Sequence, residues 1–282
     1  MRVIKLSGEV VDFNEKSLRK SLYNSGADQE DADKIFDKIC PNIYDLMPTK
    51  ELYQMAFDEL KTIKNSFAAR YKLKRAIKDL GPEGFYFERW MAKVFQAQGY
   101  EAIAGQTLEG KCGITHEIDV IASNNEETLF CECKFRNDFD AKISVTTPMY
   151  FKSRFEDLKE GSFEYFNRTI QPNNGVLITN AYFTTDSIQF AEYYNIKLIS
   201  WDYPENNSIK SLVDTMGLYP ITTMTTLTEE EEKIMLSKNC ILVKEVVQNP
   251  KLLDHFKFDE TRKNIILEEA KELIHHNKKV DS

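Results

Sequence analysis

Two short stretches, His116–Ala122 with the sequence HEIDVIA and Thr128–Phe135 with the sequence TLFCECKF, decide the fold of the central part of the chain. Alternate side chains of a β-strand share a face. We therefore expect Asp119 on the polar face of the first strand, and Glu132 with Lys134 on the polar face of the second. If the strands pair antiparallel, these three side chains converge on one side of a sheet.

The chemistry of this trio predicts a metal-dependent phosphodiesterase site. Two carboxylates bind a hard cation such as Mg²⁺ or Mn²⁺ through oxygen, and such a metal polarises a phosphoryl oxygen and generates hydroxide from bound water. The lysine orients that water or neutralises developing charge on the phosphate. The alternative is a salt-bridged trio on a half-exposed sheet face. Cys131 and Cys133 alternate with Glu132, so we expect them in the core and not on a metal.

A helix predicted over about Phe85–Gln98 adds a third carboxylate. Glu88 lies near Met91 and Phe95 on the apolar face of this helix, at 100° per residue. A carboxylate there is costly unless it is paired or bound to metal. Two interpretations stay open, a buried ion pair with an arginine or lysine and a place in the metal site.

The remaining elements divide the chain into three predicted domains, 1–82, 83–218 and 219–282. Alternation and helical spacing predict the following elements: a hairpin of Arg2–Leu6 and Glu9–Phe13, helices from Asn14 to Ser25, over Glu30–Cys40, from Thr49 and over about Phe67–Leu80 with a stop at Gly81-Pro82, a helix at Tyr150–Leu158, and a strand, helix and strand at Gly175–Thr179, Asp186–Tyr194 and Ile196–Trp201. The last three form a βαβ unit with parallel pairing. Residues 219–282 read as helical, with Thr228 as an N-cap.

Composition and charge narrow the class of protein. The 282 residues carry a net charge of -8, and residues 85–218 hold 12 basic and 19 acidic groups. This acidic segment is a poor autonomous DNA binder, because phosphate contacts need lysine and arginine. No apolar run approaches a membrane span, the first residues do not resemble a signal peptide, and the five cysteines are scattered and odd in number. We therefore expect a cytoplasmic address and no membrane partner.

Residues 83–203 resemble the Mrr-like branch of the PD-(D/E)XK restriction-endonuclease fold. The matching stretches are GFYFERWMAKVFQAQGY, HEIDVIA and ECKF, and later VLITNAYFTTDSIQFAEYYNIKLISWD. The resemblance implies a metal-binding role for Asp119 and Glu132, a catalytic role for Lys134, and a supporting catalytic, metal or water role for Glu88. Glu117 stands where this branch often has glycine, as an extra ligand or a solvated rim residue.

Residues 1–80 resemble the ATP-cone, a nucleotide-sensing module. The matching stretches are VIKLSGEVVDF, LRKSL, PTKELY and AARYKLKRAIKDLG. The resemblance implies that Val3, Lys5, Lys16 and Thr49 contact ATP or dATP. The chain has K-L-S-G where the usual motif is K-R-D-G, and Ser17 where the family's helix lysine is usual, with Lys16 one residue earlier.

Two further segments leave alternatives open. Lys61–Lys78 holds seven basic residues and no acidic one, which suits a triphosphate, DNA phosphate or a solvated helix face. The stretch LLDHFKFDETRKNIILEEAKELI loosely resembles a helix-hairpin-helix DNA element, with a helical dimerisation or docking unit as the alternative.

The sequence as a whole predicts a multi-domain α/β protein with an N-terminal ATP-cone, a central restriction-endonuclease-like core with a mixed sheet, and a C-terminal helical segment. The leading hypothesis is Mg²⁺- or Mn²⁺-dependent DNA cleavage in a restriction or defence setting, gated by ATP or dATP. The alternatives are a nucleotide-responsive DNA-binding regulator with a weak or unused nuclease site, and a nuclease for RNA or repair intermediates. We expect DNA and a nucleoside triphosphate as partners, and a homo-oligomer.

Overall fold

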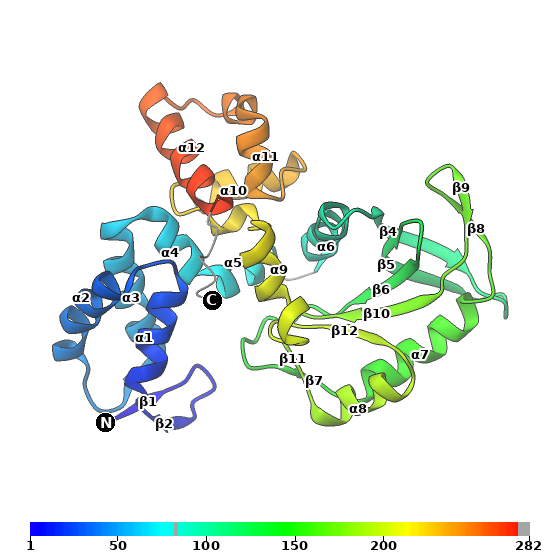
Figure 1. The fold of residues 1–282 in the computed structure, drawn as a ribbon, viewed down its shortest axis with the longest axis horizontal. Coiled ribbons are helices and arrows are strands. Elements are labelled where there is room, and N and C mark those ends of the chain that lie inside the picture. The colour runs from blue at the N-terminus through cyan, green and yellow to red at the C-terminus, as the bar shows by residue number, and fades with distance from the viewer. Residues whose placement is uncertain (82–83, 276–282) are drawn as a thin grey trace. The chain divides into compact units, whose positions relative to one another are not determined.

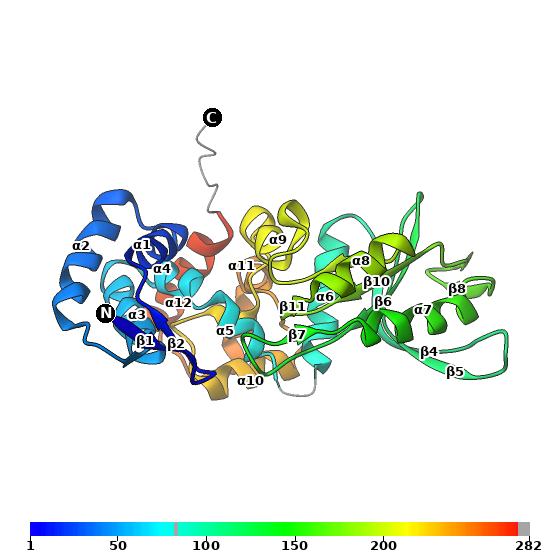
Figure 2. The same cartoon turned by 90° about the horizontal axis from the view of Figure 1, so that it is seen from below.

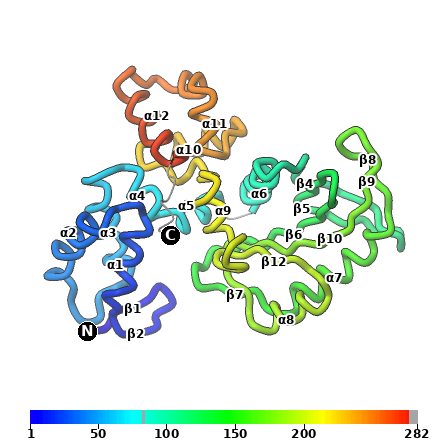
Figure 3. The backbone as a smooth tube through the Cα atoms, viewed as in Figure 1, coloured from blue at the N-terminus to red at the C-terminus, as the bar shows by residue number. Residues whose placement is uncertain are grey.

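The chain forms two compact units in a computed structural model that describes residues 1–81 and 84–275. Ile77–Pro220 make the second unit, and residues on both sides of it, Met1–Ala76 and those from Ile221 onward, make the first. The main chain passes into the second unit once and leaves it once (Figure 3). The three-part division stays a prediction, but the described C-terminal helices cluster with the N-terminal residues.

The second unit is built on a five-stranded mixed sheet in the order β12-β10-β6-β5-β4. Its strands are β4 (Glu101–Glu109), β5 (Thr115–Ser123), β6 (Thr128–Cys133), β10 (Asn174–Ile178) and β12 (Lys197–Ile199). The β4–β5 and β5–β6 pairs are antiparallel, and β10 pairs parallel with both β6 and β12. The expected antiparallel pair and the expected parallel βαβ unit are therefore both confirmed.

Helices cover both faces of this sheet. Figure 1 shows α6 (Phe85–Ala97) on one side, and α7 (Thr146–Leu158) with α8 (Thr185–Tyr193) on the other. Phe130 and Leu158 share one apolar cluster, and Phe151 and Leu177 share another, so the α7 side of the sheet has a packed core. Every residue of β6 is buried. The smaller elements of this unit are β7 (Lys142–Ile143), β8 (Phe163–Tyr165), β9 (Arg168–Ile170), β11 (Tyr182–Phe183) and α9 (Ile209–Met216).

The sequence missed the edge strand β4. Its burial alternates along the strand, but the polarity of its residues does not follow that alternation, so the sequence carries no strong period-2 signal there. Figure 2 shows β4 and β5 side by side as a long hairpin, with a register from Glu101 opposite Ser123 to Glu109 opposite Thr115. β4 is a strand because its backbone pairs with β5, and this pairing leaves no mark in the pattern of its side chains.

The N-terminal part of the first unit is a small sheet packed on helices. The sheet has the order β2-β1-β3, with β1 (Arg2–Ile4), β2 (Val10–Asp12) and β3 (Met47–Pro48). The helices are α1 (Glu15–Asn24), α2 (Gln29–Ile39), α3 (Thr49–Ile63), α4 (Asn65–Tyr71) and α5 (Leu73–Lys78), of which α5 runs on into the second unit. One apolar cluster that includes Leu22, Phe36 and Leu60 joins α1 to α4.

Local signals for these helices were partly right. Asn14 caps α1, because its side chain accepts a hydrogen bond from the Ser17 amide at 3.0 Å. Thr49 was expected to cap the third helix, which is wrong: Pro48 is the N-cap residue and Thr49 is already helical. The helix expected over Phe67–Leu80 is divided into α4 and α5 at Lys72. Pro82, part of its expected stop signal, lies outside the described residues.

The C-terminal part of the first unit is helical, as expected for its described residues. It contains α10 (Glu229–Ser237), α11 (Val243–Gln248) and α12 (Glu260–Ile274). Thr228 caps α10 in a capping box with Glu231, a reciprocal pair that satisfies two orphan donors. Residues 276–282 lie outside the described residues.

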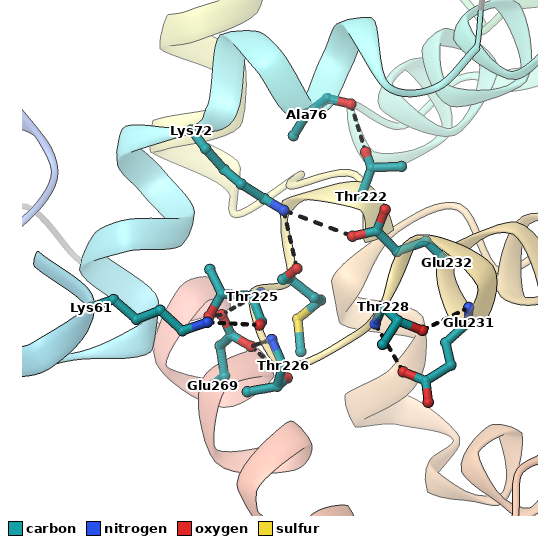
Figure 4. Close-up of polar contacts among 11 residues, drawn as sticks. Lys61, Lys72, Ala76, Thr222, Thr225, Thr226, Thr228, Glu231, Glu232 and Glu269 are labelled. Atoms are coloured by element: carbon teal, nitrogen blue, oxygen red, sulfur yellow. Dashed lines mark hydrogen bonds and ion pairs between the residues drawn. The ribbon is translucent and has the colours of Figure 1, made fainter. Parts of the chain in front are cut away.

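Polar contacts join residues 222–232, which include the start of α10, to the N-terminal helices (Figure 4). The Lys72 ammonium donates to the Met224 carbonyl at 3.1 Å and lies 3.7 Å from the Glu232 carboxylate. Lys61 donates to the Thr225 carbonyl at 3.3 Å, and the Thr222 hydroxyl donates to the Ala76 carbonyl at 2.6 Å. Two lysines of the segment Lys61–Lys78 thus bond to protein acceptors, an outcome that differs from the three alternatives of a triphosphate, DNA phosphate or a solvated helix face.

Two more basic side chains of that segment bond to α12. Lys64 pairs with Glu272 at 2.8 Å, and Arg70 donates to the Glu272 carbonyl at 2.5 Å.

Among the described residues no helix is long and apolar enough to cross a membrane.

Candidate active site

Asp119 and Glu132 face each other across two central strands. The β5–β6 register pairs Val120 with Cys131, so one further step of the antiparallel ladder sets Asp119 opposite Glu132. Asp119 Oδ2 accepts a hydrogen bond from the Cys133 amide at 2.6 Å, which ties its carboxylate to β6. The expected convergence of the two carboxylates is therefore present in the structure.

Lys134 follows directly on the last residue of β6 and is held by β10. Its amide donates to the Ile178 carbonyl at 2.7 Å, and its own carbonyl accepts from the Thr179 hydroxyl at 2.6 Å. These bonds continue the parallel β6–β10 ladder past the end of the strand. The backbone at Lys134 is thereby fixed, with its side chain on the face of Glu132.

Glu132 is the most buried carboxylate of the group, with 3% of its surface exposed. Lys134 donates to Oε1 and Arg154 donates to Oε2, the latter at 2.6 Å. A buried charge is costly unless it is paired and hydrogen-bonded, and here both carboxylate oxygens carry a cation. Among its contacts, the Arg154 guanidinium also donates to the Glu117 carbonyl on β5.

Sequence reasoning missed Arg154. It lies in the third turn of α7, and the sequence offers only an ordinary arginine in a helix with mixed charges. Its signal is tertiary, because only the packing of α7 on the sheet brings it to Glu132. Its side chain is 13% exposed, and an arginine is rarely buried to this extent unless its charge is paired.

Glu88 lies at the first turn of α6, beside the same carboxylates. The turn before it is tight: Gly84 has a φ of 80°, and a Cβ added there would come within 3.3 Å of the Phe135 Cβ and 3.8 Å of Glu88 Oε1. The Phe87 ring packs against the Phe135 ring with centroids 5.6 Å apart. These contacts place the start of α6 against the segment that follows Lys134.

The paired interpretation of Glu88 finds no support among the described residues, where its carboxylate has no hydrogen-bond or ion-pair partner. Burial, and then the negative charges of Asp119, Glu132 and Glu117, raise its pKa to about 7. Burial, and then the Glu132 charge, raise the pKa of Asp119 to about 6. The ionised carboxylates thus repel each other and lack full compensation.

This donor set fits a hard divalent cation. Carboxylate oxygens are the ligands that such cations prefer, and a bound cation would offset the burial and the repulsion that raise both pKa values. The described residues contain no group of three such side chains already arranged as a metal cage. Lys134 and Arg154 hold the Glu132 oxygens that a cation would share, so its binding requires these side chains to shift.

Cys131, Cys133 and Glu117 border the carboxylates in sequence. Cys131 and Cys133 are buried as expected, and burial raises the pKa of both thiols well above the usual range. Thiols of that kind are inert and poor metal ligands. Glu117 is exposed at the rim and contributes its carbonyl to Arg154, which agrees with the solvated alternative for its side chain.

The four residues expected to contact a nucleotide lie on different elements: Val3 on β1, Lys5 directly after it, Lys16 on α1 and Thr49 at the start of α3. The parallel β1–β3 register pairs Ile4 with Pro48, so Lys5 and Thr49 are neighbours one step further. Lys16 is in the first turn of α1, which starts after β2 at the Met1 end of β1, where Arg2 pairs with Asp12. Three residues of strand separate the two ends by about 10 Å.

Lys5 and Val3 differ in how much of each side chain a ligand could reach. The Lys5 ammonium is exposed and pairs with Glu9 at 2.7 Å, so a nucleotide phosphate would compete with a surface carboxylate. Val3 is 5% exposed. Its side chain belongs to the core, which leaves its backbone and only a small part of its surface for a ligand.

Comparison with known proteins agrees with this architecture. Family models match three consecutive segments, the ATP cone domain over residues 1–80, a restriction endonuclease domain over residues 82–203, and an AF1548-like C-terminal domain over residues 219–274. The crystal structure of AF1548, a protein of unknown function, aligns with a TM-score of 0.54 at 26% identity, covering 67% of this chain and 97% of that one.

An uncharacterised protein of Archaeoglobus fulgidus is 33% identical over 132 residues, which are 47% of this chain and 70% of the relative. The expected ATP-cone and Mrr-like restriction-endonuclease domains are both confirmed by the family models. The chain belongs to the family of this archaeal protein, as a member that carries an ATP cone, an Mrr-type restriction-endonuclease domain and an AF1548-like C-terminal domain.

Proposed function

We propose that the chain is a divalent-metal-dependent endonuclease that hydrolyses DNA phosphodiester bonds in a restriction or defence setting. The observation that carries this proposal is the convergence of Asp119, Glu132 and Lys134 where the β5–β6 pairing ends, with Glu88 beside them. A structural ion-pair network has no need for the incompletely compensated carboxylates of Asp119 and Glu88. A hydrolytic metal site does.

The residues divide the chemistry among themselves. Asp119, Glu132 and Glu88 would hold Mg²⁺ or Mn²⁺, which when bound supplies an activated water and a Lewis acid for the phosphoryl oxygen. The Lys134 ammonium, fixed by the β10 ladder, neutralises negative charge that develops on the phosphate. Asp119 keeps its orientation through the Cys133 amide.

The nucleotide part of the proposal rests on the cone. ATP or dATP bound near Lys5 and Thr49 would act as a regulator and not as a reactant. We propose that the nucleotide shifts the population of a DNA-competent, homo-oligomeric assembly, which requires different nucleotide affinities for the two states. ATP affinity and DNA affinity must then be coupled reciprocally.

The test is cleavage of plasmid DNA by the purified full chain with Mg²⁺ or Mn²⁺, with and without ATP. Asp119→Asn, Glu132→Gln and Lys134→Ala should each abolish cleavage while the thermal midpoint shows a folded protein. Lys197→Ala is the matched control. The register sets Lys197 beside Val176 and Cys131, on the sheet face away from Lys134, so this variant should cut as wild type does. Cleavage by Lys134→Ala at the wild-type rate would refute the proposed site.

One observation favours a second candidate function. Lys134 and Arg154 already occupy both oxygens of Glu132, as in a closed structural ion-pair network. This supports a nucleotide-responsive DNA-binding regulator whose nuclease site is unused. Wild-type protein that binds DNA in an ATP-dependent way, and never cuts it or RNA with either metal, would establish that alternative.

A further inference from the structure

An exposed aromatic ring lies directly outside the candidate active site. Tyr150 is 62% exposed on the first turns of α7. It precedes Arg154 by four residues, a spacing that sets two side chains on the same helix face. The Arg154 guanidinium carbon lies 5.7 Å from the centre of the Tyr150 ring.

Arg154 connects this ring to the carboxylates. Its guanidinium bonds to Glu132 Oε2 at 2.6 Å and to the Glu117 carbonyl, and its side chain is 13% exposed. The arginine is therefore fixed from the inside, and the tyrosine lies on its outer side. Stacking against a fixed cation limits where the ring can lie.

Among the described residues the Tyr150 hydroxyl has no hydrogen-bond partner. Single exposed aromatic side chains are common and need no explanation by themselves. This one differs because it borders the proposed metal carboxylates through one intervening side chain. Its neighbour Met149 is also exposed, at 49%, so the apolar surface continues along the start of the helix.

One cation beside the carboxylates is accessible to a nucleic acid strand. The Arg154 side chain is 13% exposed and bonded to protein oxygens, whereas the Lys134 side chain is 32% exposed, so its ammonium can meet a phosphate. An aromatic face beside such cations is the arrangement by which proteins hold unpaired bases, since every base has a face that stacks. A base inside a duplex already has neighbours on both faces, so it becomes available only when it is unpaired or extruded.

Resting on the proposed nuclease function, we propose that Tyr150 stacks on an unpaired base next to the scissile phosphate. The preferred substrate of the site is then a nucleic acid with a single-stranded segment at the point of cleavage. Arg154 acts as a positioning residue that fixes both the Glu132 carboxylate and the Tyr150 ring. A fully paired duplex lacks this contact and binds through phosphate contacts alone.

The experiment compares binding of a labelled single-stranded oligonucleotide and of the same sequence as a duplex, by fluorescence anisotropy at one salt concentration. All variants of the full chain carry Lys134→Ala to prevent cleavage. Tyr150→Ala should weaken single-strand binding by about 5- to 150-fold, the range for loss of one base–aromatic stack, and leave duplex binding nearly unchanged. Tyr150→Phe keeps the ring and should bind as the parent does.

Tyr193→Ala is the control, because Tyr193 is 79% exposed at the end of α8 and should not affect either affinity. Single-strand affinity that is unchanged in Tyr150→Ala, or that falls equally for the duplex, overturns the inference while wild-type cleavage still upholds the proposed function. If wild type neither binds nor cuts single strands or duplexes, the proposed function fails and this inference with it.

Discussion

Asp119→Asn should stabilise the second unit in metal-free buffer, although it removes a residue of the proposed active site. The Asp119 carboxylate is largely buried, and the Glu132 charge opposes its ionisation. An asparagine keeps an oxygen that can accept the Cys133 amide and removes the negative charge. The substitution therefore tests the cost of burying this charge beside Glu132 without breaking the local hydrogen bond.

The sign and size follow from the pKa shift. The pKa of Asp119 is raised from 3.8 to about 6, so between these values the folded state binds more protons than the unfolded state and wild-type stability falls as pH rises. Above about pH 6 the penalty is complete. A shift of about two units corresponds to about 3 kcal/mol, and relaxation around the charge reduces the expected gain to about 2 kcal/mol.

The assay is urea unfolding followed by tryptophan fluorescence, with EDTA present. Both tryptophans of the chain, Trp90 and Trp201, lie in the second unit, so the signal reports that unit. Asp119→Asn should exceed wild type by about 2 kcal/mol at about pH 8, and the difference should shrink toward zero at about pH 4. Glu126→Gln removes an exposed carboxylate of the same unit and should change little.

The reasoning fails if Asp119→Asn is no more stable than wild type at about pH 8, or if its advantage does not depend on pH. Added Mg²⁺ gives a second check. It should stabilise wild type and not Asp119→Asn, because a ligand stabilises the state that binds it.

Three further predictions address other residues. Arg154→Met leaves the buried Glu132 with one cation fewer, so it should lower the free energy of unfolding in metal-free buffer by about 3 kcal/mol. It should also enlarge the rise in the thermal midpoint on adding Mg²⁺, and equal rises in variant and wild type would contradict this. Lys5→Ala should weaken ATP binding, measured by calorimetry, more than Lys16→Ala, because only Lys5 neighbours Thr49; the reverse order would place the phosphates at the other end of β1. Glu269→Ala should lower the free energy of unfolding, followed by circular dichroism, by about 3–5 kcal/mol. The reason is that the Glu269 carboxylate is 2% exposed and accepts hydrogen bonds from the amides and hydroxyls of two threonines (Figure 4). A loss below about 1 kcal/mol would show that water replaces those bonds.

The sequence correctly predicted elements in which apolar and polar side chains alternate with a regular period. The alternation in HEIDVIA and TLFCECKF placed Asp119 and Glu132 on one face because strand geometry leaves each side chain only two directions. The βαβ unit followed from short apolar strands that flank a helix. Asn14 and Thr228 were identified as caps because capping is a local bond between a side chain and the next turn.

Other features depend on residues that are distant in sequence. Arg154 belongs to the candidate site because α7 packs on the sheet and brings it to Glu132, 22 residues away along the chain. Lys61 and Lys72 suggested a free basic surface, but they bond to carbonyls near residue 224, which no local pattern records. The edge strand β4 went unrecognised because its neighbour's backbone, and not its own periodicity, makes it a strand.

The sequence by itself thus predicted the α/β core and the shared face of Asp119, Glu132 and Lys134, because both depend on local spacing. Its resemblance to known families predicted the ATP-cone and restriction-endonuclease domains. Only the tertiary structure decided which cations neutralise Glu132 and left Glu88 beside the cluster with a pKa of about 7. Charge compensation acts through space over a few ångströms, and residues at that separation come together only when helices pack on the sheet.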